Sequence, residues 1–529
     1  MSENNTLISH FYIEFAEAPG HGDKATAAET EFMHDVLEIV VDNSLYFPDV
    51  ATILVHDPHL KWVDDKQLNP GRPVRILAKR QEPKAEKTVI FEGEVVELES
   101  AFEQSSHQLT VRAFDRLHRL ARGRHVRTFQ NTKDSDVASQ IAREVKLKTD
   151  IKETRAVHEH LFQNNKTNLE FLRERAHALG YLLFVSGDKL CFKPPAQQPQ
   201  PIELQWGVTL GQFCPRLTTI GQHSKIVVRG WDIGTRQEVR SEADNGDGTR
   251  DIQDDKHKKS GGHQTEEGFN LKTTYLVTGA PVRTQSEADH LARVIADREA
   301  ERFIEAEGTC GGNPAIVAGA SVKIKAVGER FSGTYFVTAT THTYNSHEGY
   351  LTHFSISGQT PISLLRLLRG SDEEQSLHPA TSLVIGIVTD NQDPKGLGRV
   401  KVKYPQLSGE HTSDWARVVT VGAGPQRGLQ FTPEVNDEVL VGFEMGNIHY
   451  PYVIGGLWNG RDGPPTGKGQ GQIILQDKSG NKIAIDGNSN SLILQDKSGN
   501  KIAINGNSNS LEIDVKGEVN IKGSVINLN

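Results

Sequence analysis

The sequence of 529 residues is poor in the residues that cross-link a fold or fill a thick core. It has only three cysteines, Cys191, Cys214 and Cys310, which lie far apart and form no CxxC pair. This excludes a disulfide framework and a cysteine zinc site, and it fits folding in a reducing cytoplasm. Aromatic residues make up only 7%, whereas glycine occurs 49 times, a composition typical of strands and turns.

Other absences limit the classes of function. No run of about 18 apolar residues occurs, which excludes a membrane-spanning helix. The amino-terminal residues show no basic start followed by an apolar stretch, so we expect no secretory signal peptide. The formal net charge of −9 argues against general nucleic-acid binding, which needs an excess of Lys and Arg.

The sequence also contains none of the common catalytic or nucleotide-binding motifs. GxSxG, HExxH, GxxxxGK[ST] and a strand-linked GxGxxG are all missing. The 21 histidines include the pairs His56/His59, His118/His125, His158/His160 and His342/His347, none of which has a partner set at metal-ligand spacing. We therefore expect no catalytic, cofactor-binding or metal-binding residues, no cofactor, and a chain that is not an enzyme.

The strongest positive signal is a repeat near the carboxy terminus. Residues 474–492 and 493–511 differ only at Asp486 and Asn505, and a degenerate third copy occupies residues 512–529. Apolar residues alternate with polar ones in short segments, which predicts strands separated by Gly- and Asn-containing turns. Each strand offers only two or three apolar side chains, so one chain alone would bury little, whereas three chains around one axis would treble the buried surface.

We therefore expect residues 471–529, called the needle below, to form an intertwined, trimeric β-helix. A disordered tail and a monomeric β-solenoid are the alternatives. The predicted needle core consists of Ile473, Leu475, Ile483, Ile485, Leu492, Leu494, Ile502, Ile504, Leu511, Ile513, Val519 and Ile521. Ile526 and Leu528 would form an apolar, blunt end that favours a capping partner, and we expect Ile526, Leu528 and Asn529 to bind that partner.

Residues 382–460, called the barrel below, precede a short linker at 461–470. Five strand-like runs (383–388, 398–404, 416–421, 438–443 and 451–456) lie between turn residues, which suits an oligonucleotide/oligosaccharide-binding (OB) fold. Acidic residues outnumber basic ones in this segment, so single-strand binding is disfavoured. We expect its aromatic residues to close the barrel and pack against other copies. They are Trp415, Phe431, Tyr450, Tyr452 and Trp458.

The ordered motifs of this segment carry a family resemblance. Gly386-Ile387-Val388, Trp415-Ala416-Arg417-Val418 and the run from Pro451 to Gly460 closely resemble the OB domain of the VgrG family. Those proteins are the spikes of type VI secretion systems and related contractile phage tails. The resemblance implies a trimeric β-helical needle after the barrel, which agrees with the repeat.

Residues 1–360 mix strands with a few helices. Thr167 to Glu170 has the form of a capping box, an apolar stripe follows, and Gly180 provides the stop; a second helix is predicted from about residue 134. The runs from Asn164 to Tyr181 and from Val111 to Leu120 resemble the hub module of VgrG and phage late-control D proteins. That resemblance implies two β-barrels per chain, forming a pseudo-sixfold ring in the trimer.

Three further features of this region are explained without a specific binding or catalytic function. The cluster Arg112, Arg116, Arg119, Arg122, Arg124 and Arg127 could suggest a phosphate-binding patch, but solvated or intersubunit charges are favoured. Residues 241–268 are polar and Gly-rich, which predicts an exposed inserted loop. Residues 361–381 are expected to form a short helix and acidic linker.

The sequence thus predicts a mainly β, multi-domain fold with some α+β character and a structural role. The resemblance implies the homotrimeric central spike of a contractile injection apparatus, which adapts a sixfold tube to a threefold needle and pierces the target envelope. Expected partners are inner tube and baseplate proteins, a PAAR-type tip protein and effector cargo, with transient membrane contact and no nucleic acid. We expect assembly in the cytoplasm, with a phage-tail-like particle that is released favoured over a membrane-anchored secretion system. A wall-hydrolysing activity hidden in the hub and a trimeric glycan-binding adhesin are the alternatives.

Overall fold

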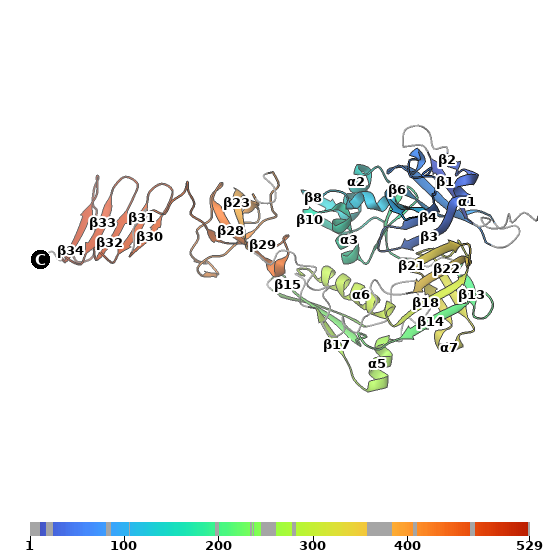
Figure 1. The fold of residues 1–529 in the computed structure, drawn as a ribbon. Coiled ribbons are helices and arrows are strands. Elements are labelled where there is room, and N and C mark those ends of the chain that lie inside the picture. The colour runs from blue at the N-terminus through green and yellow to red at the C-terminus, as the bar shows by residue number, and fades with distance from the viewer. Residues whose placement is uncertain are drawn as a thin grey trace, which may run out of the picture.

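The computed structural model describes residues 11–16, 25–80, 86–104, 106–195, 200–232, 235, 237–244, 261–277, 282–356, 383–405, 410–465 and 471–526. The chain forms a bulky amino-terminal module, called the hub below, a small barrel and a thin needle, arranged in that order along an elongated molecule (Figure 1). The carboxy terminus lies at the end of the needle farthest from the amino-terminal module. None of the helices in the described ranges has the length and apolar character needed to span a bilayer.

One sheet of eleven strands organises the amino-terminal module. Its β3–β4–β7–β6–β5–β1–β2 half and its β14–β18–β22–β21 half are joined where β21 pairs with β3. The two predicted barrels are thus parts of one continuous sheet. The strands, in spatial order, are β14 (Gln212–Leu217), β18 (Ile304–Gly311), β22 (Gly349–Ile356), β21 (Ala339–Asn345), β3 (Val36–Ser44), β4 (Val50–His56), β7 (His107–Asp115), β6 (Thr88–Phe102), β5 (Pro73–Ala78), β1 (Phe11–Ala16) and β2 (Ala25–Ala27).

Smaller sheets surround this one. They are β10 (Val157–Lys166) with β8 (His125–Lys133); β11 (Leu182–Ser186), β12 (Lys189–Lys193) and β9 (Lys148–Ile151); β13 (Ile202–Gln205), β19 (Ser321–Lys325) and β20 (Gly333–Phe336); and β16 (Gln237–Asp244), β15 (Lys225–Asp232) and β17 (Thr274–Val277). The helices are α1 (Thr30–Asp35), η1 (Lys66–Leu68), η2 (Arg116–Ala121), α2 (Asp134–Glu144), α3 (Asn168–Leu179), α5 (Gly261–Phe269), α6 (Gln285–Glu301) and α7 (Gly328–Phe331).

Both predicted helices are confirmed as α2 and α3. At α3 the Thr167 hydroxyl accepts the Glu170 N–H at 3.1 Å, and the Glu170 carboxylate accepts the Thr167 N–H at 2.8 Å. Gly180 ends the helix in the left-handed conformation, φ 65°, where a side chain would cost energy. The strand–turn–strand unit predicted after it is also confirmed, as β11 and β12.

The prediction of a loop over 241–268 was wrong at both ends. Residues 241–244 continue β16, which pairs with β15 along its whole length, and residues 261–268 lie in α5. Local polarity concealed both elements: β16 shares its sheet with apolar β15, and α5 starts on Gly261, where a Cβ would lie 2.0 Å from Oε1 of Gln222. The rest of this segment, and the linker predicted at 361–381, lie outside the described residues.

The barrel has the five predicted strands, two of them shorter than expected. The sheet order is β24 (Lys401–Lys403), β23 (Val384–Asp390), β28 (Glu438–Phe443), β29 (Pro451–Gly456) and β25 (Arg417–Val418). A bridge between Val400 and Ala416 connects the two ends of this order and closes the barrel. Six valines with no exposed surface fill it: Val388, Val400, Val402, Val439, Val441 and Val453. A small hairpin of β26 (Ala423–Gly424) and β27 (Arg427–Gly428) projects from it, and η3 (Glu444–Gly446) precedes β29.

The needle is a five-stranded antiparallel meander of one chain. Its strands β30 (Gln472–Gln476), β31 (Lys482–Asp486), β32 (Ser491–Gln495), β33 (Lys501–Asn505) and β34 (Ser510–Asp514) pair in consecutive order. The expectation that strands interlace between chains is therefore wrong for the hydrogen bonds, because short turns fold each strand back onto its predecessor.

The third repeat also differs from the prediction. Val519 and Ile521 follow β34 without joining a strand, and both are exposed. The segment after Asp514 lacks the Asp-Lys-Ser-Gly-Asn turn that reverses the chain in the first two repeats, so nothing folds it back onto β34.

Candidate functional site

One face of the needle carries its apolar side chains uncovered. The strand registers pair Leu475 with Ile483, Ile483 with Leu494, and Leu494 with Ile502, so these residues form a row across the sheet. A parallel row lies two residues away along each strand. We call the two rows the needle face: Leu475, Ile483, Leu494, Ile502 and Ile513, and Ile473, Ile485, Leu492, Ile504 and Leu511.

The needle face is unusually open to solvent. Leu492 is half-buried, but every other member is exposed, up to 71% at Ile473 and 64% at Leu511. Single exposed apolar residues are ordinary on a protein surface, whereas a contiguous sheet face of this size marks an interaction site. Ten of the twelve predicted core residues are thus brought together, and the exceptions are Val519 and Ile521.

The opposite face of the same sheet is suited to water. Its middle row is Ile474, Ala484, Ile493 and Ala503, of which the two alanines are buried. The remaining side chains of that face are polar and flank the row at both strand ends, with the long ones mainly at one end: Gln476, Lys482, Gln495 and Lys501. Because such side chains cover neighbouring apolar groups with their methylene stems, this face needs no partner. The sheet is therefore amphipathic, with the needle face on its apolar side.

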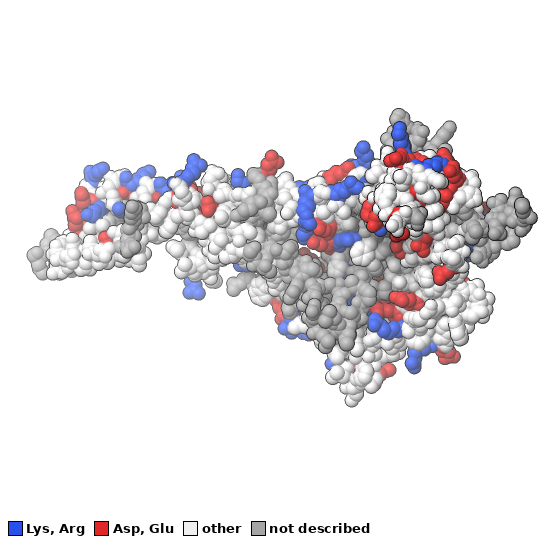
Figure 2. Space-filling view, viewed as in Figure 1, with Lys and Arg blue, Asp and Glu red and all other residues white. Residues whose placement is uncertain are grey.

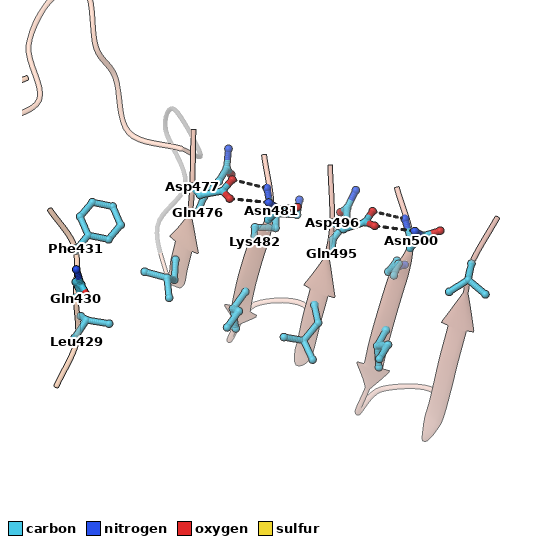
Figure 3. Close-up of a pocket in the computed structure, with 16 residues that line it drawn as sticks. Leu429, Gln430, Phe431, Gln476, Asp477, Asn481, Lys482, Gln495, Asp496 and Asn500 are labelled. Carbon is cyan, nitrogen blue, oxygen red and sulfur yellow. Dashed lines mark hydrogen bonds between the residues drawn. The ribbon is translucent and has the colours of Figure 1, made fainter. Parts of the chain in front are cut away.

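The turns at one margin of the needle form a ladder that links the repeats. The Asp477 carboxylate accepts the Asn481 N–H at 2.8 Å and its amide N–H at 2.6 Å, and Asp496 holds Asn500 in the same way (Figure 3). The amide oxygen of Asn481 in turn accepts the N–H of Lys497 at 2.9 Å. The Asn481 hydrogen bond lowers the pKa of Asp477, so the ladder is formed by the ionised carboxylate.

The two margins of the needle differ in charge. Lysines recur in the Asp-Lys-Ser-Gly-Asn turns, whereas the turns at the other margin consist largely of Gly, Asn and Ser. Figure 2 shows basic side chains along one margin of the needle. Both margins of the five-stranded sheet are polar, so neither margin extends the apolar surface of the needle face.

A groove begins where the barrel meets the needle. It has a volume of about 540 Å³ and is lined by Leu429 and Phe431 of the barrel and by the Leu475–Ile502 row of the needle face. Figure 3 shows Leu429, Gln430 and Phe431 on a separate segment beside the first needle strand. An ion pair between Lys478 and Glu434 connects the two parts close by. The groove makes the barrel surface continuous with the needle face.

The other residues singled out in the sequence have ordinary partners. Five of the six arginines of the predicted cluster form ion pairs within the chain, whereas Arg122 lies 3.2 Å from a ring nitrogen of His118. The pairs are Arg112 with Glu97 and Glu99, Arg116 with Glu92, Arg119 with Glu94, Arg124 with Glu170, and Arg127 with Glu144. Burial raises the pKa of Glu94, but hydrogen bonds from His118 and Arg119 outweigh it and lower that pKa to about 2. These five arginines are occupied by carboxylates, so a phosphate-binding patch has no support.

The histidines do not gather into a site. Across the described ranges, no three His, Cys, Asp or Glu side chains are grouped as a metal ion would require. His158 bonds to Asp134 at 2.7 Å, and fully buried His342 bonds to the Tyr350 hydroxyl at 2.9 Å. All three cysteines carry unpaired thiols.

Of the predicted barrel aromatics, only two are strongly exposed. Phe431 and Trp458 face solvent, whereas Arg399 and Lys401 lie over the ring of Trp415. Tyr450 and Tyr452 contact Arg283 and Arg417 respectively. Of the predicted tip residues, Ile526 is exposed, and Leu528 and Asn529 lie outside the described residues.

Sequence reasoning missed the joint between the amino-terminal module and the barrel. Phe162 of β10 is buried in the barrel core, with its ring 6.2 Å from that of Tyr404. A ring nitrogen of His160 lies 2.9 Å from the Thr412 carbonyl oxygen, and Arg283 pairs with Glu444 at 2.7 Å. The only sequence signal was the adjacent pair Leu161 and Phe162, because a two-stranded ribbon cannot bury two successive side chains on its opposite faces by itself.

Comparison with known proteins agrees with this architecture. Residues 384–458 match the type VI secretion system/phage-baseplate injector OB domain. A chain of the half-lidded PdpA–VgrG complex from Francisella is similar at TM-score 0.59 and 8% identity, over 97% of this chain and 89% of that one. The E. coli c3393 protein, described as a type VI secretion component resembling the T4 tail proteins gp27 and gp5, is similar at TM-score 0.50 and 13% identity, over 80% of this chain and 97% of that one. No curated protein matches the chain.

In the order of its parts, a hub-like module, an injector OB barrel and a terminal β-sheet, the chain is similar in fold to these type VI secretion and phage-baseplate proteins. Its fold is mainly β, as predicted. Residues 25–346, more than half of the chain, match the Alg8 N-terminal domain, and the chain belongs to that family.

Proposed function

We propose that three copies of this chain associate through their needle faces to form the central spike of a contractile injection apparatus. The single observation that carries the proposal is the needle face, a set of ten apolar side chains on one side of a sheet whose hydrogen bonds are already made. Burying what is left exposed on those side chains would contribute roughly 1 kcal/mol each, hence about 10 kcal/mol per copy. That is as large as the total stability of an ordinary domain.

The width of the sheet favours three copies. Five-residue strands at about 3.4 Å per residue make a face roughly 17 Å wide, and a closed triangle of such faces places its axis about 5 Å from each. Sheets that pack face to face lie about 10 Å apart, so inward side chains of one sheet reach about 5 Å. Two inward side chains per strand therefore fill a triangular prism, whereas a two-sheet sandwich leaves both margins of the apolar layer open to water.

The proposed action is mechanical and not enzymatic. The hub-like module would dock on the inner tube and baseplate and adapt sixfold to threefold symmetry, while the needle would lead through the target envelope during sheath contraction. Similarity to spike and tail proteins supports this role. The PdpA–VgrG relative supports a cargo partner, and we propose a PAAR-type tip protein beyond exposed Ile526. Assembly would take place in the cytoplasm, within a phage-tail-like particle that is released.

Light scattering of the full chain tests the proposal. We expect a particle of three times the chain mass, and removal of residues 471–529 should abolish it while the hub and barrel keep their circular dichroism. A monomeric full-length protein would contradict the proposal. In a parallel zymogram on bacterial wall material we expect no clearing; clearing would replace the mechanical role by a hydrolytic one.

A further inference from the structure

The near-identity of the two repeats creates a problem of register for any assembly of needles. Residues 474–492 and 493–511 differ at one position only, so the needle face looks the same after a shift of two strands. Leu475 and Ile483 then take the places of Leu494 and Ile502. With strands about 4.8 Å apart, this shift moves one chain by about 10 Å along the axis.

Side-chain packing on the needle face opposes such a slip only weakly. A displaced copy loses contacts at its ends but keeps equivalent apolar contacts in between, and repetitive strands are prone to this kind of slippage. The hydrogen bonds do not help, because each needle makes them within its own chain. A unique register therefore requires an apolar contact outside the repeat.

Residues 429–431 of the barrel, here called the register finger, supply such a surface. Leu429 is 43% exposed and Phe431 is 60% exposed, although both lie beside the first needle strand. Their own chain leaves them uncovered, and the groove joins them directly to the needle face. The partner that covers the needle face is therefore the partner that covers the finger, which is a second copy of this chain.

The finger is also held in a defined position, as a stop must be. The Leu429 N–H donates to the Val421 carbonyl at 3.3 Å, and the Thr420 hydroxyl donates to the Leu429 carbonyl. At Gly428, φ is 142° and a Cβ would lie 2.2 Å from the Gly422 carbonyl oxygen, so only glycine fits this close approach. The Lys478–Glu434 ion pair ties the following residues to the first needle turn.

We propose that the register finger of each copy docks against the first repeat of a neighbouring needle and fixes the axial register of the three chains. This rests on the proposed trimer. The finger lies outside the repeat, so it has no second equivalent position. A neighbouring needle that is displaced by one repeat in one direction leaves Leu429 and Phe431 exposed to water. Displacement in the other direction makes the first strand of that needle collide with the barrel.

Disulfide mapping tests the register directly. In a Cys214→Ser background, Ile483→Cys and Ile502→Cys are placed at equivalent positions of the two repeats, and chains of two isotopic compositions are mixed, refolded together and oxidised. Chains in register form disulfides between like positions, whereas a slipped chain joins 483 to 502 of another chain. The two positions within one needle lie two strands apart, about 10 Å, which exceeds disulfide reach.

With the native finger we expect like-position disulfides to dominate. Leu429→Ser combined with Phe431→Ser should leave the particle mass at three chains and raise the 483–502 product about tenfold, since two apolar contacts are lost. Trp206→Ser, an exposed apolar residue of the hub, serves as the matched control and should change nothing. If the double variant does not form trimers, Phe431→Ser alone is scored by the same measurement.

The outcomes separate the two proposals. A finger variant that stays trimeric with a native level of the 483–502 product would overturn the register role and leave the trimeric spike standing. A monomeric chain with the native finger in the parent Cys214→Ser protein would remove the trimer itself.

Discussion

The hub and the needle use the same strand pattern with opposite outcomes. In β7 of the hub, every second residue is buried, and Leu109, Val111 and Ala113 have no exposed surface. In the needle, Leu494 and Ile502 likewise share one face with every second residue of their strands, yet both remain more than 40% exposed. Both sheets have complete strand pairing within the chain. The needle strands therefore already have their hydrogen-bonding partners, and what the needle lacks is an apolar surface packed against its exposed face.

The hub–barrel contact and the barrel–needle contact also differ in how much apolar surface they bury. The hub meets the barrel through an inserted aromatic, Phe162, together with an ion pair and a histidine contact. The barrel meets the needle across an open groove and the Lys478–Glu434 pair. Hub and barrel are thus packed as one body, and the needle extends from it as a thin sheet (Figure 1).

A charge on the needle face should have the largest effect. Leu494→Asp would place a carboxylate among the apolar rows of every copy, at a cost of about 3 kcal/mol or more per chain if the face is buried. We expect loss of the trimer in light scattering. Asn505→Asp, on the opposite face at the position where the first repeat has Asp486, is the matched control and should leave the particle intact. Equal particle mass for both variants would show that the needle face is not an interface.

The hub–barrel joint should come next. Phe162→Ala removes a buried ring from the barrel core and should lower the free energy of unfolding by about 3–5 kcal/mol. Val157→Ala, an exposed position on the same strand, should change it by less than about 0.5 kcal/mol. Urea unfolding followed by tryptophan fluorescence measures both. If only the tryptophans of the barrel reported a lower unfolding free energy, hub and barrel would unfold separately, and this would contradict a single packed body.

These contrasts explain how far the sequence alone could be interpreted. Local signals were enough for α3, because Thr167, Glu170 and Gly180 act within one or two turns, and for the barrel strands, whose valines alternate between turn residues. Local signals could not predict long-range strand pairing. No residue near Asn43 indicates that β3 pairs with β21, almost 300 residues later in the chain. The needle face was predictable as a set, but its arrangement was not, because alternation fixes which residues share a face and leaves open which chain supplies the neighbouring strand.

The register finger should be more sensitive to shape than most exposed loops. Gly428→Ala adds a methyl group at a left-handed φ and against the Gly422 carbonyl, so we expect a loss of about 1–3 kcal/mol, confined to the hairpin. Gly460→Ala has open space around its Cβ and should be nearly neutral. Hydrogen exchange of the Leu429 amide gives the readout. Unchanged protection in Gly428→Ala would mean that the finger is not held by this turn.

Acid should also weaken the hub–barrel body, through His449. Burial, and then positive charges led by Arg175 and His160, lower the pKa of His449 from 6.5 to about 3. The folded protein therefore binds this proton less readily than the unfolded chain does. Its stability is complete above pH 6.5 and falls as the pH drops toward 3, by up to about 1.4 kcal/mol per pH unit. Thermal unfolding of His449→Gln from pH 7 to 4 should show a shallower loss than the native protein. The exposed-turn variant His347→Gln should keep the native slope, and an unchanged slope in His449→Gln would assign the acid sensitivity elsewhere.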